Sequence, residues 1–360
     1  MRAQNILVFR IGQLGDTIVA LPAMWAVKNH FRNARFTLLC DRHPGKPFVL
    51  AAVLLRGTDI FDEFKDYIVN DSANGRLARP FRMLGLLWRL RRGKFDALVY
   101  LAPSARTAEQ VARDRKFFSA AGIKHFIGMR GFVELPKKVP GQPLGATLPE
   151  SDLILARLAA DGIPVPPIGK GSLDLRLGPM ERAEVEAWTA TLLEDGARIW
   201  IGIGPGSKMP AKLWPEVRFR EVVMKLIKAY DVWPIIFGGE EDRELGQRLL
   251  RTWGRGHNAA GALSLRGAGE ALRRCKLYLG NDTGTMHLAA AVGIPCVAVF
   301  SSREWPGMWF PYGVKQKVFR SPIECEGCGL IECLKWQNEC LNRIQVRDVL
   351  AACEEFLAQN

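Results

Sequence analysis

The sequence predicts an α/β protein with two halves, each built on a parallel sheet. The run "NILVFR" (5–10) is followed by a glycine-bearing loop, a helical stretch and a second strand-like run, "RFTLLCD" (35–41). A strand, a turn, a helix and a strand in this order begin a parallel sheet. The same order starts again at "RIWIGIGPGS" (198–207). A chain of 360 residues is also too long for one ordinary core, so two domains are expected.

A stretch rich in proline and glycine, 162–179, separates the two halves and is interpreted as an interdomain linker. We therefore expect a first domain over 1–165, a second over 180–342, and a terminal helical segment over 343–360. Residues 129–150, rich in proline, glycine and lysine, are predicted to form a loop.

The remaining elements follow from alternating apolar runs and helical periodicity. In the first half the strand 95–102 is followed by helices at 107–122 and 151–161. In the second half we expect helices at 216–230, 241–253 and 265–275, strands at 232–239, 276–282 and 295–300, and a last helix at 345–359.

The net charge of +13 favours an anionic partner, such as a phosphorylated small molecule, an anionic lipid or a nucleic acid. Nucleic acid is disfavoured because the chain has no helix-turn-helix signal, no RNA-binding aromatic signature and no long basic tail. No apolar run approaches the length of a membrane span. The first residues enter a strand without the apolar core of a signal peptide, so we expect a cytoplasmic protein.

Two loops at the expected carboxyl edge of the second sheet suit phosphate. In "GPGSKMPAKLWP" (204–215) glycines let the backbone approach an anion, and Lys208 and Lys212 add positive charge. The spacing is not that of a P-loop, and an ordinary turn with surface lysines is the alternative. In "GNDTGTMH" (280–287) an acid, hydroxyls and a histidine stand between a strand and a helix, where Asp282 or Thr283 could also serve only as a helix cap. Two such turns in one half indicate a site for a nucleotide diphosphate.

Asp16, in "RIGQLGDTIVALPA", stands at or near a helix start in the first half. It fits two roles: a helix cap, or a general base that takes a proton from a substrate hydroxyl.

Three segments together, "ILVFRIGQLGDTIVALPAMWAVKNHF", "PGSKMPAKLWP" and "GNDTGTMHLAAAVGIPCVAVF", resemble family 9 glycosyltransferases, the bacterial heptosyltransferases of lipopolysaccharide assembly. The resemblance implies the GT-B fold: two Rossmann-like domains facing a cleft, with the C-terminal helix crossing back to pack on the first, acceptor-binding domain. It also implies a metal-independent inverting transfer of a sugar, heptose, from a nucleotide diphosphate donor, ADP-heptose, to a glycan acceptor such as lipopolysaccharide core. Residues 41–150 match the family least.

The resemblance also assigns roles to single residues. Asp16 matches the general base, Ser207 and Lys212 the residues that hold the donor phosphates, Glu240 the acid that contacts the ribose, and Asp282, Thr283, Gly284 and His287 the donor-binding turn. Lys212 is expected to stabilise the leaving group as well, Gly206 and Lys208 to complete the donor loop, and Gln13 and Arg106 to bind the acceptor. The chain departs from the family where Thr285-Met286 replaces Leu-Ser, and where "IGQLGD" replaces Ser-Ser before Gly-Asp.

Four of the eight cysteines, Cys325, Cys328, Cys333 and Cys340, follow the spacing C-x2-C-x4-C-x6-C. Four thiols can surround one tetrahedral zinc or iron ion, and a reducing cytoplasm disfavours disulfides. The resemblance extends to protein-modifying heptosyltransferases that hold iron in such a quartet. The alternative is four unligated thiols in a loop. A metal here would be structural, and no cofactor is expected in catalysis.

The stretch 76–94 is a predicted basic helix that mixes leucines and a phenylalanine with arginines. Its apolar residues would pack partly on the sheet. Its basic face is either simply solvated or contacts an anionic membrane surface or a phosphorylated glycolipid acceptor. The basic residues are Arg76, Arg79, Arg82, Arg89, Arg91, Arg92 and Lys94.

Three other functions stay open at this point. One is a heptosyltransferase that modifies a protein or a natural product and carries a metal in its cysteine quartet. Another is a nucleotide-sugar epimerase, which would need no acceptor surface. The third, not an enzyme, is a metal-stapled nucleic-acid-binding module that uses the +13 charge.

Overall fold

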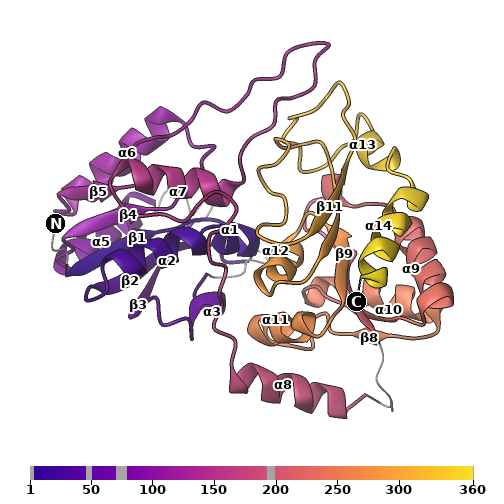
Figure 1. Cartoon of the computed structure of the whole chain (residues 1–360). Helices are drawn as coiled ribbons and strands as arrows, with labels where there is room; N and C mark the ends of the chain where they lie inside the picture. Colours follow the sequence, from indigo (N-terminus) through magenta and orange to yellow (C-terminus); the bar gives the residue numbers. More distant parts are fainter. Residues whose placement is uncertain (1–3, 46–50, 70–78, 193–198, 360) are drawn as a thin grey trace. The chain divides into compact units, whose positions relative to one another are not determined.

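The computed structural model of the chain describes residues 4–45, 51–69, 79–192 and 199–359. The chain divides into two compact units, coloured along the sequence in Figure 1. Unit 1 comprises Met1–Leu135 and Glu150–Leu175, and unit 2 comprises Pro136–Pro149 and Arg176–Asn360. Each has its own sheet, as the sequence predicts.

Unit 1 contains a parallel sheet of five strands in the order β3-β2-β1-β4-β5. The central strands are almost wholly buried and apolar, as expected for a parallel sheet covered on both faces. Helix α2 packs against α7, and α5 against α6. The strands are β1 Asn5–Phe9, β2 Arg35–Arg42, β3 Glu63–Ile68, β4 Ala97–Tyr100 and β5 His125–Ile127; the helices are α1 Leu14–Val19, α2 Leu21–His30, α3 Ala51–Leu55, α5 Arg79–Arg92, α6 Ala108–Ala120 and α7 Glu150–Ala160.

Unit 2 contains a parallel sheet in the order β11-β10-β9-β6-β7-β8. Helices α9, α10 and α14 cover one face and α11 and α12 the other (Figure 1). The strands are β6 Trp200–Gly204, β7 Trp233–Ile236, β8 His257–Asn258, β9 Leu277–Asn281, β10 Cys296–Phe300 and β11 Gln316–Arg320; the helices are α8 Pro179–Ala190, α9 Glu216–Tyr230, α10 Arg243–Trp253, α11 Leu265–Arg273, α12 Gly284–Ala291, α13 Glu339–Asn342 and α14 Val346–Ala358, with single 3-10 turns η1 Pro210–Lys212 and η2 Glu240–Asp242.

The strand order in each sheet creates a point where the chain reverses its direction of travel across the sheet. In unit 1 this point lies between β1 and β4, and in unit 2 between β6 and β9. Loops that leave neighbouring strands at such a point diverge to opposite faces and leave room for a ligand. The loops 10–16 and 101–107, and 205–214 and 282–283, are those loops.

The boundary between the units differs from the predicted one. Residues 136–149, predicted within the first domain, belong to unit 2. The Thr147 amide donates to the Pro306 carbonyl at 2.9 Å, and the Leu144 amide to Glu326 Oε2 at 3.1 Å. The chain passes from unit 1 to unit 2 between Leu175 and Arg176, within the stretch 162–179 that the sequence analysis interprets as a linker.

The last helix, expected in segment 343–360, is present as α14. Helix α14 contacts α9, β9 and β10. Its buried residues, Val349, Ala352, Cys353 and Phe356, join the apolar core of unit 2. The described part of this segment is therefore a component of unit 2.

No helix in the described ranges combines the length and the apolar character that crossing a bilayer requires. The predicted basic helix is present as α5, which starts at Arg79; Arg76 and Leu77 lie outside the described residues.

Candidate functional site

Lys212 and Asp282 form the centre of the candidate site in unit 2. The Nζ atom of Lys212, at the end of η1, lies 2.7 Å from Oδ2 of Asp282, the first residue after β9. Both side chains are largely buried, with 14% and 4% of their surfaces exposed. The two loops that the sequence analysis assigns to one site therefore contact each other at the β6–β9 switch point.

Asn281 holds the two loops together. Its side chain is fully buried, donates from Nδ2 to the Pro205 carbonyl at 2.7 Å, and accepts the Trp214 amide through Oδ1 at 3.1 Å. Both ends of loop 205–214 are therefore fixed to the end of β9. Asn281 was not among the predicted site residues. Its position in "GND", directly after an apolar run, could have indicated a polar side chain at the end of a strand.

Thr283 and Gly284 open helix α12 beside this pair. The hydroxyl of Thr283 lies 2.9 Å from that of Thr285, and the hydroxyl of Thr285 lies 2.8 Å from that of Tyr278. Free N–H groups at a helix start attract an anion. The turn thus presents backbone N–H donors beside the linked hydroxyls of Thr283, Thr285 and Tyr278.

His287 is buried in α12, and its ring meets Trp309 edge to face. Burial lowers the pKa of His287 to about 4; the negative charge of Asp282 opposes this shift and the positive charge of Lys212 adds to it. The imidazole is therefore neutral near pH 7. The charges that act on it are those of Asp282 and Lys212.

The loop 206–208 is held by the turn η2. Asp242 accepts the Gly239 amide at 3.0 Å, and its carboxylate occupies the space that a side chain at Gly206 would take. Burial raises the pKa of Asp242. Lys208 Nζ lies 3.6 Å from Glu241, and Ser207 Oγ accepts the Met209 amide at 3.1 Å.

Glu240, expected to contact a ribose, is 70% exposed and forms an ion pair with Arg243 at 2.7 Å. Its carboxylate also lies against Gly261. Glu240 precedes Glu241, the residue of η2 whose carboxylate lies near Lys208.

Asp16 lies in the first turn of α1 in unit 1. Its Oδ2 accepts the Gln13 amide at 2.9 Å, so it fixes the helix start. Its Oδ1 lies 3.4 Å from the guanidinium of Arg10, and the side chain keeps 27% of its surface exposed. The helix-cap role is therefore present, and the carboxylate remains accessible for a second role.

Arg10 was missed in the sequence, where it reads as the last residue of a strand. It is fully buried and donates to the Leu101 carbonyl at 2.6 Å and to the Asp16 carbonyl. Because these contacts join the ends of β1 and β4, Arg10 fixes the position of Asp16 at the switch point of unit 1.

Arg106, the other predicted acceptor residue besides Gln13, forms an ion pair with Asp114 at 3.3 Å. Asp114 also accepts the Tyr100 hydroxyl at 2.8 Å. The Arg106 side chain is 14% exposed, so any anion it binds would compete with Asp114.

The four clustered cysteines, Cys325, Cys328, Cys333 and Cys340, lie near one another in unit 2. All four are free thiols. Burial raises the pKa of Cys325, and the other three cysteines of the cluster raise it further. Within the described residues, no three His, Cys, Asp or Glu side chains lie close enough together to hold a metal ion. The donor chemistry suits zinc or iron, and a metal held by this cluster stays a prediction.

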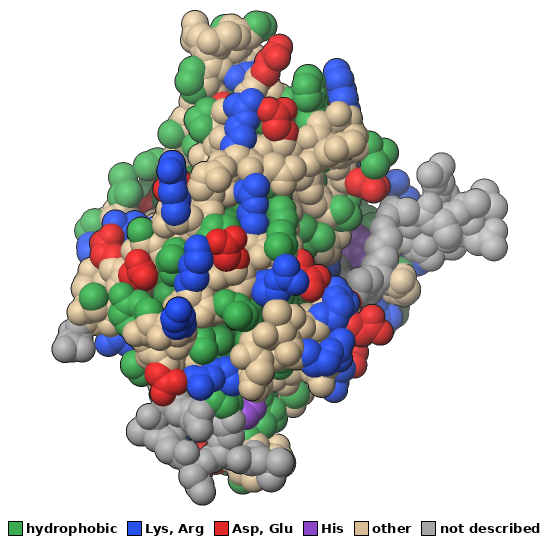
Figure 2. Space-filling view, turned by 90° about the vertical axis from the view of Figure 1, so that its right-hand side faces the viewer, with side chains coloured by type: hydrophobic (Ala, Val, Ile, Leu, Met, Phe, Trp, Pro, Cys, Tyr) green, Lys and Arg blue, Asp and Glu red, His purple; other side chains and the backbone are tan. Residues whose placement is uncertain are grey.

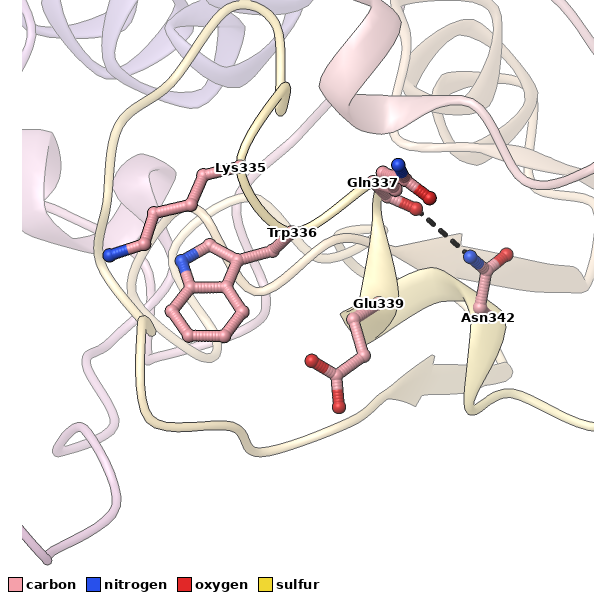
Figure 3. A pocket seen from close by; sticks show the side chains of 5 residues that line it. All are labelled: Lys335, Trp336, Gln337, Glu339 and Asn342. Carbon is pink, nitrogen blue, oxygen red and sulfur yellow. Dashed lines mark hydrogen bonds between the residues drawn. The ribbon is translucent and has the colours of Figure 1, made fainter.

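An open pocket of about 320 Å³ is lined by residues between 335 and 342, a range that includes the last cysteine of the cluster, Cys340. Figure 3 shows Trp336 and Lys335 on one side of it, while Asn342 donates to the Gln337 carbonyl at 2.9 Å on the other. Glu339 completes the lining, and none of the predicted site residues belongs to it.

The positive charge of the chain is spread over the surface on the face drawn in Figure 2. Lys and Arg side chains are distributed over it with Asp and Glu between them. A groove that follows a nucleic-acid backbone would gather basic side chains without acidic ones. This face gives no support to the nucleic-acid-binding alternative.

The family model described as glycosyltransferase family 9 (heptosyltransferase) matches residues 159–336. Lipopolysaccharide heptosyltransferase 2 of Salmonella typhimurium is 35% identical over 129 residues, which are 33% of this chain and 36% of the relative. Lipooligosaccharide heptosyltransferase 2 of Campylobacter jejuni is 23% identical over 96% of this chain and 95% of its own length.

A solved structure, that of Escherichia coli ADP-heptose lps heptosyltransferase II, has a TM-score of 0.68 with 19% identity. It covers 99% of this chain and 99% of its own. The likeness shows the fold, GT-B, with two parallel-sheet domains, as the sequence predicts.

Proposed function

Because the chain belongs to glycosyltransferase family 9, we propose that it transfers a sugar from a nucleotide diphosphate donor to a glycan acceptor. The donor is ADP-heptose and the acceptor a lipopolysaccharide-core-type glycan. This proposal is supported by the names of the relatives, which are heptosyltransferases of lipopolysaccharide or lipooligosaccharide, and by the structural neighbour named for ADP-heptose.

The observation that carries the proposal is the buried pair of Lys212 and Asp282 at the switch point of unit 2. A buried ion pair contributes little to the stability of a fold, so a role in ligand binding explains this pair better than stability does. In the proposed complex the ammonium group binds the diphosphate and the carboxylate accepts sugar hydroxyls. The amides at the start of α12 add donors to the phosphate. Gly206, Ser207 and Lys208 hold the other side of the diphosphate, and Glu240 binds the ribose.

The reaction is a single displacement with inversion. The acceptor hydroxyl oxygen forms a bond to the anomeric carbon while the bond from that carbon to the diphosphate oxygen breaks. The acceptor proton goes to Asp16, and the bonding electron pair leaves with ADP. Lys212 stabilises the charge that develops on the leaving group. No metal or cofactor takes part in these steps.

The acceptor side of the proposal rests on unit 1. Gln13 and Arg106 bind the acceptor, with Arg106 exchanging its contact with Asp114 for an anionic group of the glycan. We propose that the enzyme acts in the cytoplasm.

The first test is a thermal-shift panel with ADP, GDP, UDP, CDP and dTDP. A ligand at about 100 times its Kd stabilises the folded state by about 2.7 kcal/mol. A shift with ADP alone, reduced in Lys212→Met but kept in Lys225→Met on the exposed face of α9, supports the donor site. A response to another base keeps the site and changes the donor, and no response to any nucleotide contradicts the proposal.

The second test is product formation. ADP-heptose and a lipopolysaccharide core acceptor should yield ADP and a product heavier by one heptose, detected by mass spectrometry. Conversion of the donor without an acceptor, to an isomer of equal mass, would instead indicate an epimerase.

A further inference from the structure

Helix α5 carries two apolar faces, and only one of them packs on unit 1. Leu86 and Leu90 are buried in the core, with Met83 and Leu87 packed partly against it. Phe81, Leu84 and Trp88 are instead exposed by 77%, 62% and 58%. Spacings of three and four residues place these last three along one side of the helix. Packing of the core therefore accounts for the first face and leaves the second unexplained.

Arginines accompany the exposed apolar face. The helix contains Arg79, Arg82, Arg89, Arg91 and Arg92 and no acidic residue. Arg91 and Arg92 follow Trp88 by three and four residues, so they are its neighbours on the helix surface. The guanidinium carbon of Arg92 lies 4.0 Å from the centre of the Trp88 ring. The stripe of Phe81, Leu84 and Trp88 is thus bordered by cations.

We propose that α5 docks this protein on an anionic phospholipid surface. The helix lies in the plane of the interface. Phe81, Leu84 and Trp88 enter the boundary between head groups and acyl chains, and the arginines contact lipid phosphates. Large apolar side chains, including a tryptophan, with cations beside them are the pattern of helices that lie on a membrane. The proposed attachment is peripheral, with α5 on the surface of the bilayer.

Charge and shape favour lipid over other occupants of this face. A nucleic acid would use the arginines but not three exposed apolar side chains in line. A second copy of the chain would bring the same five arginines against each other, because a two-fold interface pairs a patch with itself. An anionic bilayer satisfies both the apolar stripe and the cations. The proposal goes beyond the transfer reaction and does not depend on it.

The test is co-sedimentation of the full chain with vesicles. One set is an equimolar mixture of phosphatidylglycerol and phosphatidylethanolamine, and the other is phosphatidylcholine alone. The wild-type protein should bind the anionic vesicles, bind the neutral ones at least about tenfold more weakly, and be released as salt screens the charges.

Two variants separate the contributions of the helix. Leu84→Glu with Trp88→Glu removes the apolar stripe, and Arg91→Gln with Arg92→Gln removes two cations. Each should weaken binding to anionic vesicles by about tenfold or more. The matched control is Met180→Glu with Val217→Glu, which places two acids on exposed apolar positions of α8 and α9. All substituted sites in the glutamate variants are exposed, and unchanged melting temperatures verify that the variants fold.

Three results would overturn the proposal. The first is no vesicle binding by the wild-type chain. The second is equal loss of binding in the variants and the control. The third is self-association of the lipid-free protein in sedimentation velocity that is abolished by the Leu84→Glu and Trp88→Glu substitutions. That result would assign the exposed face of α5 to an interface between copies of the chain. Because vesicle binding is measured without substrate, failure of the proposed reaction would not affect the result.

Discussion

The hydroxyl of Tyr278 lies 2.8 Å from the hydroxyl of Thr285, in space that is open only because residues 204 and 280 are glycines. A side chain at either glycine would overlap the Tyr278 hydroxyl. The contact passes on to Thr283, whose hydroxyl lies 2.9 Å from that of Thr285. A tyrosine buried in β9 thereby orients the first hydroxyl of the candidate donor turn.

Substitution of Tyr278 by Phe should weaken donor binding while keeping the fold. Loss of one hydrogen bond to the hydroxyl chain costs about 1 kcal/mol, so we expect the KM for the donor to rise about fivefold with a smaller change in kcat. Steady-state kinetics measures this split. Tyr230→Phe, on α9 and remote from the turn, is the control; equal KM values in both variants would show that the chain of hydroxyls has no role in binding.

Lys212→Met should impair the chemical step more than it impairs folding. The variant removes the cation that stabilises the leaving group, and loss of one such group typically costs 10²- to 10³-fold in kcat, or about 3–4 kcal/mol. Single-turnover kinetics with saturating donor provides the measurement. Lys225→Met removes an exposed lysine of an α9 ion pair and should leave kcat unchanged. A kcat within a few-fold of wild type in Lys212→Met would remove Lys212 from the mechanism.

Two substitutions at Asp16 separate its helix-cap role from its proposed role as a base. Asn retains an oxygen that accepts the Gln13 amide, whereas Ala does not. Asp16→Asn should therefore keep the melting temperature near wild type but lower turnover by about 10²-fold or more, because an amide takes no proton. Asp16→Ala should lose turnover and also about 1 kcal/mol of stability. Nucleotide shifts should be unchanged in both; an active Asp16→Asn enzyme would leave Asp16 as a cap alone.

The buried imidazole of His287 should make stability depend on pH. Its pKa is about 4 in the folded state and about 6.5 when unfolded, so between these values only the unfolded chain binds the proton. Stability from this residue is complete above about pH 6.5 and is lost as pH falls toward 4, by at most about 3 kcal/mol. Urea unfolding at pH 7.5 and 5 measures the difference. His287→Gln should shrink it, and an unchanged difference would contradict the buried neutral state.

The repeated α/β pattern was predictable because apolar strands and helical periodicity are local features. The predicted helix 216–230 coincides with α9, and loop residues from 204–212 and 280–287 do meet. Their meeting follows from parallel topology, which brings the ends of β6 and β9 to one edge.

Other contacts depend on partners distant in the sequence, and no local pattern marks them. Glu326 binds the Leu144 amide across 182 residues, which assigns loop 136–149 to unit 2. Arg10 reads in the sequence as the end of an ordinary strand. It positions Asp16 only because it also donates to the carbonyl of Leu101, the residue that follows β4. Helix α14 has an apolar face that would fit any exposed sheet face, so the sequence alone did not identify its partner in unit 2.

The last prediction concerns the metal content of the cysteine cluster. The spacing predicts about one zinc or iron ion per chain, held by thiols that lie near one another. We expect metal analysis of protein purified without chelator to find that ion, and Cys328→Ser to lose it, since Cys328 is exposed and its substitution disturbs no packing. Cys40→Ala, a buried thiol of unit 1, should retain the metal. Loss of metal should lower the melting temperature and leave turnover of the folded enzyme unchanged, because no step of the proposed reaction uses it. Metal-free wild-type protein with the same melting temperature as Cys328→Ser would show that the quartet is four unligated thiols.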